Sequence, residues 1–227
     1  MGGLGEEVRL NDDTGTVVHL APEHRTIIDL IAEGSRVMDL GCGEGDLLLA
    51  LKVMKKVRAE GIELSDACIQ SCVAKGLFNV HHGNLDEGLA DYPDQSIDDV
   101  ILTNTIQVLH RPLLLIREMA RVGKRCMVSF PNFAHWRVRW QLGLEGRMPK
   151  TGQLPYEWYE TLNIHLTTIV DFRAFCRQAA LPVLREIPLR TSRSGPSSEA
   201  RFLPNLLADS AIFVLAGGGA AAKEISH

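Results

Sequence analysis

Continuous apolar runs alternate with amphipathic stretches along most of the chain, and polar turn residues separate them. A run such as Val100-Ile101-Leu102 has the character of a strand that is buried on both faces of a sheet. We expect strands over residues 36–40, 57–64, 78–82, 97–103, 124–130, 184–189 and 211–216. We expect helices over residues 22–32, 46–55, 66–75, 111–122 and 168–180. This alternation predicts an α/β fold with parallel strand pairing and right-handed crossovers.

The stretch from residue 132 to residue 165 interrupts the alternation. It is rich in Trp, Tyr, Arg, Pro and Gly, and it is too long for an ordinary connection between a strand and a helix. We therefore divide the chain into a flexible N-terminal segment (1–19), one domain (20–216) and a disordered tail (217–227). Within the domain, we interpret residues 131–166 as an aromatic and basic insertion that forms either a lid or a partner-binding surface.

The composition is ordinary for a globular protein. It indicates the cellular compartment more than it indicates the fold. The chain has 227 residues, 45% of them hydrophobic and 23% charged, with a formal net charge of −4. This charge argues against a surface devoted to nucleic acid or to an anionic membrane. No apolar run approaches the roughly 18 residues that span a bilayer, and the chain start lacks a basic-then-apolar signal sequence. The five cysteines form no C-x-x-C pair, so we expect a reducing, cytoplasmic setting.

The stretch R-V-M-D-L-G-C-G-E-G-D, residues 36–46, joins a predicted strand to a predicted helix through three glycines at alternate positions. A strand, a tight glycine turn and a helix are typical of the place where an open α/β sheet holds a nucleotide. Three acids surround the turn, namely Asp39, Glu44 and Asp46. They would repel the pyrophosphate that a dinucleotide places at a helix N-terminus, which disfavours an NAD-dependent oxidoreductase. An acidic turn suits a cationic ligand without phosphate, and S-adenosylmethionine or its product S-adenosylhomocysteine fits this description.

Further candidate residues follow the next two strands. Glu63 ends the second strand about 20 residues beyond the turn, where a carboxylate can accept from both ribose hydroxyls. Asn84 and Leu85 follow the third strand and offer a side-chain oxygen and a backbone N–H to an adenine. Taken singly, each is more often a turn residue or a solvated acid at a strand end. The predicted cofactor site comprises Asp39, Gly41, Cys42, Gly43, Gly45, Glu63, Leu64, Asn84, Leu85 and Asn104.

These motifs resemble those of the class I S-adenosylmethionine-dependent methyltransferases. A narrower resemblance, to the MetW family of methionine biosynthesis, is carried by G-N-L-D-E-G-L from Gly83, T-N-T-I-Q-V-L from Thr103, F-P-N-F-A-H-W-R-V-R from Phe130, G-R-M-P from Gly146 and L-P-Y-E-W-Y-E-T-L-N-I-H-L from Leu154. It implies a Rossmann-like domain with a seven-stranded, mostly parallel sheet, an antiparallel last strand and helices on both faces. It also implies a role alongside homoserine O-acetyltransferase. The chain departs from the family pattern at Asn84, Ala134 and Leu162, where aspartate, glycine and proline are usual.

The sequence assigns no catalytic residue. Candidate bases by residue type are His110, His135, Tyr156, Tyr159 and His165, but no two of them have the spacing of a catalytic pair. Cys42 is an unfavourable nucleophile because nearby acids oppose its thiolate. We expect no metal site, since His81 and His82 would point to opposite faces of a strand.

If residues 135–140 are helical, Trp136 and Trp140 share a face flanked by Arg137 and Arg139. That face is consistent with a lid over the cofactor, a partner surface, a site for an anionic substrate or a cover for the sheet edge. Two functions remain open. The chain either binds S-adenosylmethionine and acts with homoserine O-acetyltransferase, or it transfers a methyl group to a small molecule or protein.

Overall fold

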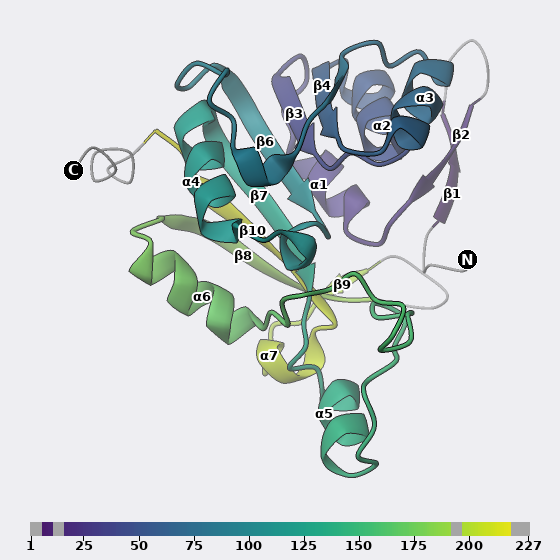
Figure 1. Ribbon diagram of the computed structural model, residues 1–227, viewed down its shortest axis with the longest axis vertical. Coiled ribbons are helices and arrows are strands. Elements are labelled where there is room, and N and C mark those ends of the chain that lie inside the picture. Colours follow the sequence, from purple (N-terminus) through teal and green to yellow (C-terminus); the bar gives the residue numbers. More distant parts are fainter. Residues whose placement is uncertain (1–5, 11–15, 192–196, 219–227) are drawn as a thin grey trace.

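A computed structural model of the protein describes residues 6–10, 16–191 and 197–218. Eight strands form one mixed sheet in the order β5-β4-β3-β6-β7-β10-β8-β9 (Figure 1). They are β3 (Arg36–Leu40), β4 (Arg58–Glu63), β5 (Val80–His82), β6 (Ile97–Thr103), β7 (Gly123–Pro131), β8 (Val183–Arg190), β9 (Ser198–Glu199) and β10 (Ser210–Ala216). Strands β3 to β7 pair in parallel, as the alternation of strand and helix predicts.

Strand β10 lies between β7 and β8 and is antiparallel to both, with Phe213 opposite Val128 on one side and Glu186 on the other. The predicted α/β Rossmann-like class and the antiparallel last strand are therefore confirmed. The predicted count of seven strands is wrong by one. The additional strand, β9, has two residues and pairs with the end of β8, which is too short to leave a periodic signal in the sequence.

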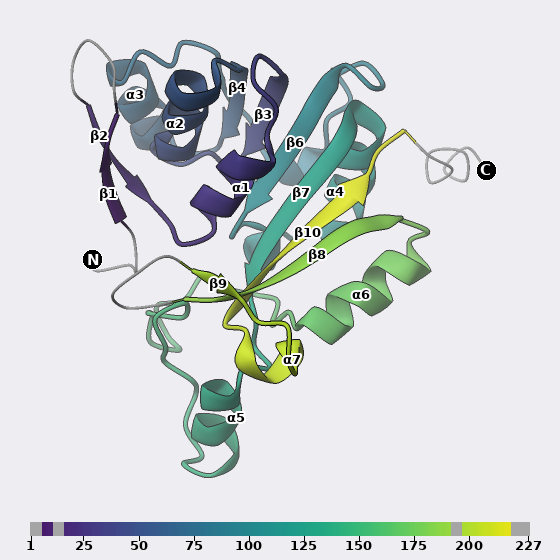
Figure 2. The same cartoon turned by 180° about the vertical axis from the view of Figure 1, so that it is seen from behind.

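Helices cover both faces of the sheet, as Figure 1 and the view from behind in Figure 2 show. The helices are α1 (His24–Leu30), α2 (Asp46–Lys55), α3 (Asp66–Ala74), α4 (Pro112–Val122), α5 (Trp136–Gly143), α6 (Ile169–Gln178) and α7 (Pro204–Leu207). Two 3₁₀ turns, η1 (Leu85–Glu87) and η2 (Ile106–Val108), follow β5 and β6. One hydrophobic cluster packs α4 and α6 on the sheet, and a second packs α1, α2 and α3 on the opposite face. Apolar runs such as Val100-Ile101-Leu102 of β6 are buried between these two layers.

The N-terminal segment differs from our expectation of flexibility. Its described residues form an antiparallel hairpin of β1 (Glu6–Arg9) and β2 (Val17–Leu20). Val18 and Leu20 are buried in the cluster that contains α2, whereas Val17 and His19 are exposed. The predicted tail lies outside the described residues beyond Gly218.

Residues 131–166 connect β7 to α6, and we call them the aromatic extension. They include helix α5, which projects beyond the ends of the strands in both views (Figures 1 and 2). Backbone hydrogen bonds join the extension to the segments beside it: Phe133 N–H donates to Thr167 O, before α6, at 3.1 Å, and Ile164 N–H donates to Gln107 O, in η2, at 2.8 Å. Across the described ranges, no helix is long and apolar enough to cross a membrane.

Candidate functional site

The glycine turn after β3 adopts the left-handed backbone that its composition predicts. Gly41, Gly43 and Gly45 have φ of 72°, 55° and 80°. The turn is held against β4 by a hydrogen bond from Gly41 N–H to Ile62 O at 2.8 Å. A Cβ at Gly45 would lie 2.6 Å from Leu77 Cδ1, so this glycine allows close packing. A Cβ at Gly43 would meet nothing within 4 Å, so the backbone there faces open space.

The turn lies at the topological switch point of the sheet, where open α/β folds bind ligands. Strand β3 has β4 on one side and β6 on the other, and the chain runs outward from it in both directions. A Cβ at Gly41 would lie 2.9 Å from Thr105 Oγ1, so the loops after β3 and β6 touch. The predicted residues of these loops therefore meet at one edge of the sheet.

Glu63 ties this turn to the end of β4. Its Oε2 accepts from Gly43 N–H at 2.8 Å, and its Oε1 accepts from the N–H groups of Leu64 and Ser65, each at 2.9 Å. A carboxylate offers about four lone-pair positions, and these bonds use three. Contact with both ribose hydroxyls would therefore require the bond to Gly43 to lengthen. The role of Glu63 toward a ribose stays a prediction.

Asp39 is the second acid of the turn and is almost completely buried, with 1% of its surface exposed. Burial raises the pKa of its carboxyl group to about 7, and the negative charge of Glu63 acts in the same direction. Its Oδ1 has no hydrogen-bond partner among the described residues. A buried acceptor in this state favours a ligand that brings hydrogen-bond donors or positive charge.

The turn carries less uncompensated negative charge than its three acids suggest. Lys75, at the end of α3, forms an ion pair with Asp46 at 2.8 Å and lies 4.0 Å from the carboxylate of Glu44. Two of the three acids that we expected to repel a pyrophosphate are therefore partly neutralised. The negative potential rests mainly on Asp39 and Glu63.

The remaining predicted cofactor residues have defined local roles. Asn84 caps η1, where its Oδ1 accepts from Asp86 N–H at 3.1 Å, and Leu85 is buried. Leu64, next to Glu63, is 60% exposed and offers an apolar surface at the same edge. Cys42 is buried, and burial raises the pKa of its thiol, with the charge of Asp39 acting in the same direction. The larger cause is thus burial, not the acids that we considered first.

Asn104 follows β6 with a positive φ of 49°, which is uncommon for a residue other than glycine. Its side-chain amide donates to the carboxylate of Glu23, a residue that the sequence analysis did not select. Glu23 precedes α1 and is 1% exposed. The sequence places it in a predicted helix start, where a glutamate is unremarkable. Only the pairing of residues 81 positions apart reveals it.

No candidate base is joined to this edge by a side-chain hydrogen bond among the described residues, although the backbone N–H of His165 donates to Gln107 O at 3.0 Å. His110 and His165 are exposed, and Tyr156 and Tyr159 are 61% and 67% exposed. His135 instead caps α5, with its Nδ1 accepting from Arg137 N–H at 3.4 Å, and burial lowers its pKa. Within the described ranges no three His, Cys, Asp or Glu residues gather into a metal site.

The aromatic extension presents a second feature, a broad exposed apolar surface. Its exposed large side chains include Trp140, Leu144, Tyr156, Trp158, Tyr159 and Leu162. Trp140 and Trp158 are 54% and 69% exposed. Apolar surface of this extent on one segment marks an interaction site more often than a free surface. The tryptophans therefore do not cover the sheet edge, which was one of the interpretations left open.

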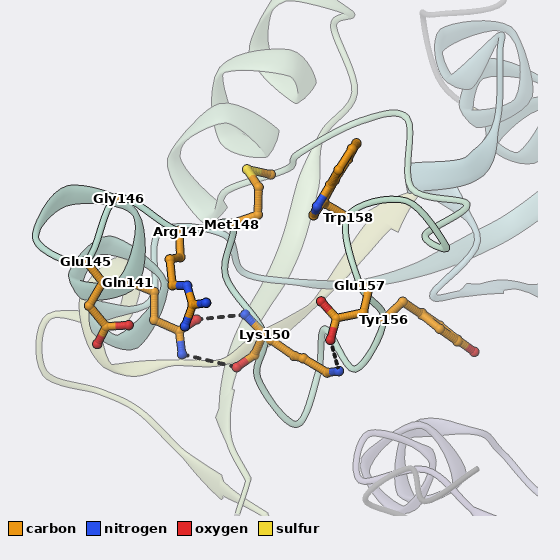
Figure 3. Close-up of a pocket in the computed structure, with 9 residues that line it drawn as sticks. All are labelled: Gln141, Glu145, Gly146, Arg147, Met148, Lys150, Tyr156, Glu157 and Trp158. Carbon is orange, nitrogen blue, oxygen red and sulfur yellow. Dashed lines mark hydrogen bonds and ion pairs between the residues drawn. The ribbon is translucent and has the colours of Figure 1, made fainter.

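A cavity of about 560 Å³ lies within the extension, and Figure 3 shows the residues that line it. The Lys150 ammonium pairs with Glu157 at 2.6 Å. The side-chain amide of Gln141 accepts from Lys150 N–H at 2.7 Å and donates to Lys150 O at 3.2 Å. A second cavity of about 390 Å³ shares Met148, Tyr156 and Trp158 with the first. Polar contacts thus stabilise the extension, and its two cavities lie beside the same aromatic side chains, Tyr156 and Trp158.

Comparison with known proteins identifies relatives over most of the chain. The family model described as "Methionine biosynthesis protein MetW" matches residues 21–215. A "Bifunctional methionine biosynthesis protein MetXA/MetW" of Rhodopirellula baltica is 31% identical over 204 residues, covering 86% of this chain and 32% of the relative. A phosphatidylethanolamine N-methyltransferase of Cereibacter sphaeroides is 30% identical over 111 residues, covering 46% of this chain and 53% of the relative. The chain thus spans about a third of the first relative and about half of the second.

Solved structures give the same fold. An S-adenosylmethionine-dependent methyltransferase of Thermotoga maritima matches with a TM-score of 0.62 at 17% identity, covering 86% of this chain and 87% of its own. One from Archaeoglobus fulgidus matches with a TM-score of 0.61 at 15% identity, covering 85% and 90%. At such identities the likeness establishes the methyltransferase fold and nothing finer.

Proposed function

Since this chain belongs to the MetW family of methionine biosynthesis proteins, we propose that it binds S-adenosylmethionine or S-adenosylhomocysteine and acts with homoserine O-acetyltransferase. The observation that carries the partnership is the relative named for both MetXA and MetW, in which the region similar to this chain makes up about a third of the length. Joining two proteins in one chain is an effective way to hold them together.

The geometry of the glycine turn supports the cofactor. Open space faces the backbone at Gly43, and two acids of this edge are Glu63, which accepts from Gly43 N–H, and the buried Asp39. Their negative charge favours the sulfonium and ammonium groups of S-adenosylmethionine. Asn84 and Leu85 would receive the adenine, and Leu64 would cover it. When bound, the cofactor supplies an activated methyl group; the residues of this chain bind and orient it.

The aromatic extension supports the partner. Interface hot spots are enriched in Trp, Tyr and Arg and lie in well-packed pockets. The extension offers exposed aromatic side chains beside two cavities and carries Arg137 and Arg147. Helix α5 projects beyond the ends of the strands in Figure 1, which leaves its exposed side chains accessible to a partner.

The test is to combine the purified chain with homoserine O-acetyltransferase. We expect a complex by size-exclusion chromatography with light scattering, and a change in the rate of acetyl transfer to homoserine. S-adenosylhomocysteine should alter that rate only if it binds the free and complexed chain with different affinity. No complex at micromolar concentrations, together with an unchanged rate, would exclude the partnership.

Methyl transfer is the second candidate function, and the observation that favours it is the 30% identity to an N-methyltransferase over 111 residues. Labelled S-adenosylmethionine, incubated with the chain and a cell extract, tests it directly. An acceptor labelled above background would establish an enzyme. Cofactor binding without any labelled product would support the binding function and exclude methyl transfer to the acceptors in that extract.

A further inference from the structure

A group of buried oxygen atoms without partners lies next to the glycine turn. Glu23 Oε1 accepts from the Asn104 side-chain amide, but Glu23 Oε2 has no hydrogen-bond partner among the described residues. The side-chain oxygens of Asn104 and Gln107 are also without partners there. Glu23 and Gln107 are 1% and 5% exposed. Buried polar atoms are nearly always hydrogen-bonded, so three such oxygens in one neighbourhood indicate a missing donor.

Hydrogen bonds place these three residues together. Gln107 Nε2 donates to Asn104 O at 2.9 Å, and the Asn104 amide reaches Glu23. The residue after Asn104, Thr105, contacts the glycine turn at Gly41. The three oxygens therefore lie at the switch point of the sheet, beside the candidate cofactor site, on the side formed by the segment before α1.

When Glu23 is ionised, the charge at this place is negative, and no ion pair among the described residues compensates it. Burial raises the pKa of Glu23, and the neighbouring charge that acts on it, that of Asp209, is also negative and acts in the same direction. A neutral donor would satisfy the oxygens but leave the ionised carboxylate buried without a counter-ion. A carboxylate or phosphate ligand would be repelled. A group with positive charge and several N–H donors would satisfy both requirements.

We propose that Glu23, Asn104 and Gln107 bind a primary ammonium group. An ammonium has three donors and no acceptor, and the site offers three acceptors. The ammonium can belong to the methionine part of the cofactor, in which case the inference rests on the proposed function. It can also belong to a separate amino-acid ligand. The chemistry that recognises it is the same.

The experiment compares two nucleosides by calorimetry. S-adenosylhomocysteine carries the ammonium, and S-adenosyl-4-mercaptobutanoate lacks only that group. Glu23→Gln keeps the shape of the side chain and removes its charge, and Asp29→Asn, an exposed acid on the same helix, is the matched control. We expect Glu23→Gln to lower the affinity for S-adenosylhomocysteine roughly 10- to 100-fold, which is the range of one charge-assisted hydrogen bond. The affinity for the second nucleoside should not change.

A second arm identifies a separate amine. L-homoserine is titrated into protein saturated with S-adenosyl-4-mercaptobutanoate; binding to the wild type and not to Glu23→Gln supports the site through an amino-acid ligand. If Glu23→Gln changes neither S-adenosylhomocysteine nor L-homoserine binding, the inference is overturned. If the wild type binds neither nucleoside, the proposed function fails and L-homoserine alone decides this site. If Glu23→Gln does not fold, the same two nucleosides are compared with Gln107→Met. This change removes one of the three oxygens and keeps a side chain of similar volume.

Discussion

At the scale of single residues, Asp39 combines near-complete burial with an acidic neighbour. Its pKa in the folded protein, about 7, lies above the ordinary value of 3.8. The folded state therefore prefers the protonated form. The stability that this preference contributes is complete below the unfolded pKa and is lost as the pH rises through about 7. Ionised Asp39 thus opposes folding at neutral pH.

We expect the free energy of unfolding of the wild type to fall by about 2 to 3 kcal/mol between about pH 5 and about pH 8 on account of this group. Asp39→Asn should remove that fall, because the amide does not titrate. Denaturant unfolding at both pH values measures it, with Asp29→Asn as the exposed control. An equal fall in Asp39→Asn and the wild type would show that another group is responsible.

Two glycines of the turn make separable predictions. Gly45→Ala should lower the free energy of unfolding by about 2 to 4 kcal/mol, because its Cβ would collide with Leu77 and Cys72 in the core at a positive φ. Gly43→Ala should cost only about 1 kcal/mol, since its Cβ meets open space and only the backbone is strained. Gly43→Ala should nevertheless lower the affinity for S-adenosylhomocysteine, because the alanine methyl group would occupy the space that the ligand needs.

Unfolding in denaturant and calorimetric titration measure these two effects. Wild-type affinity in Gly43→Ala would mean that the cofactor does not approach the turn at this residue. Similar stability of the two variants would mean that the packing around Gly45 can adjust.

At the scale of elements, the aromatic extension is expected to supply binding energy without stabilising the fold. Trp140→Ala and Trp158→Ala should each weaken the complex with homoserine O-acetyltransferase by roughly 10-fold or more. Because both side chains are more than half exposed, thermal unfolding should change little. Phe78→Ala is the control, since Phe78 is 77% exposed but lies between α3 and β5. Equal losses in all three variants would point to a general surface effect.

Elements with a strong local signal were predicted from the sequence with their observed bounds. Strand β6 contains the apolar run Val100-Ile101-Leu102, and helix α2 begins after the last glycine of the turn. The β1–β2 hairpin and β9 were missed because strands of four and two residues show almost no periodicity. Tertiary packing decides such short elements.

The candidate site also contains residues that the sequence predicts and residues that it does not. Residues at the ends of parallel strands, such as Glu63, could be predicted because the fold brings strand ends to one edge. Glu23 and Lys75 could not, because each meets its partner across 81 and 29 residues of chain. No local pattern in the sequence encodes such a pairing.

At the scale of the whole molecule, the candidate site joins loops from four strands, and ligand binding should therefore stabilise the entire fold. With S-adenosylhomocysteine at about 100 times its Kd, mass action adds about 2.7 kcal/mol, which corresponds to a rise in Tm of roughly 5–10 °C. NAD should give no comparable rise, because Asp39 and Glu63 face its pyrophosphate. Thermal unfolding by circular dichroism compares the two ligands. An equal rise with NAD would contradict the assignment of a phosphate-free cofactor.

The position of β10 has a consequence for how the protein is made. Although it is the last strand among the described residues, it lies inside the sheet, between β7 and β8. Until residues 210–216 have left the ribosome, β7 has an unpaired edge and β8 has no connection to the parallel strands. The nascent chain therefore exposes an incomplete sheet until this strand has been made. A chain that ends at Asp209 should aggregate when it is expressed, and sedimentation of the cell lysate would detect this.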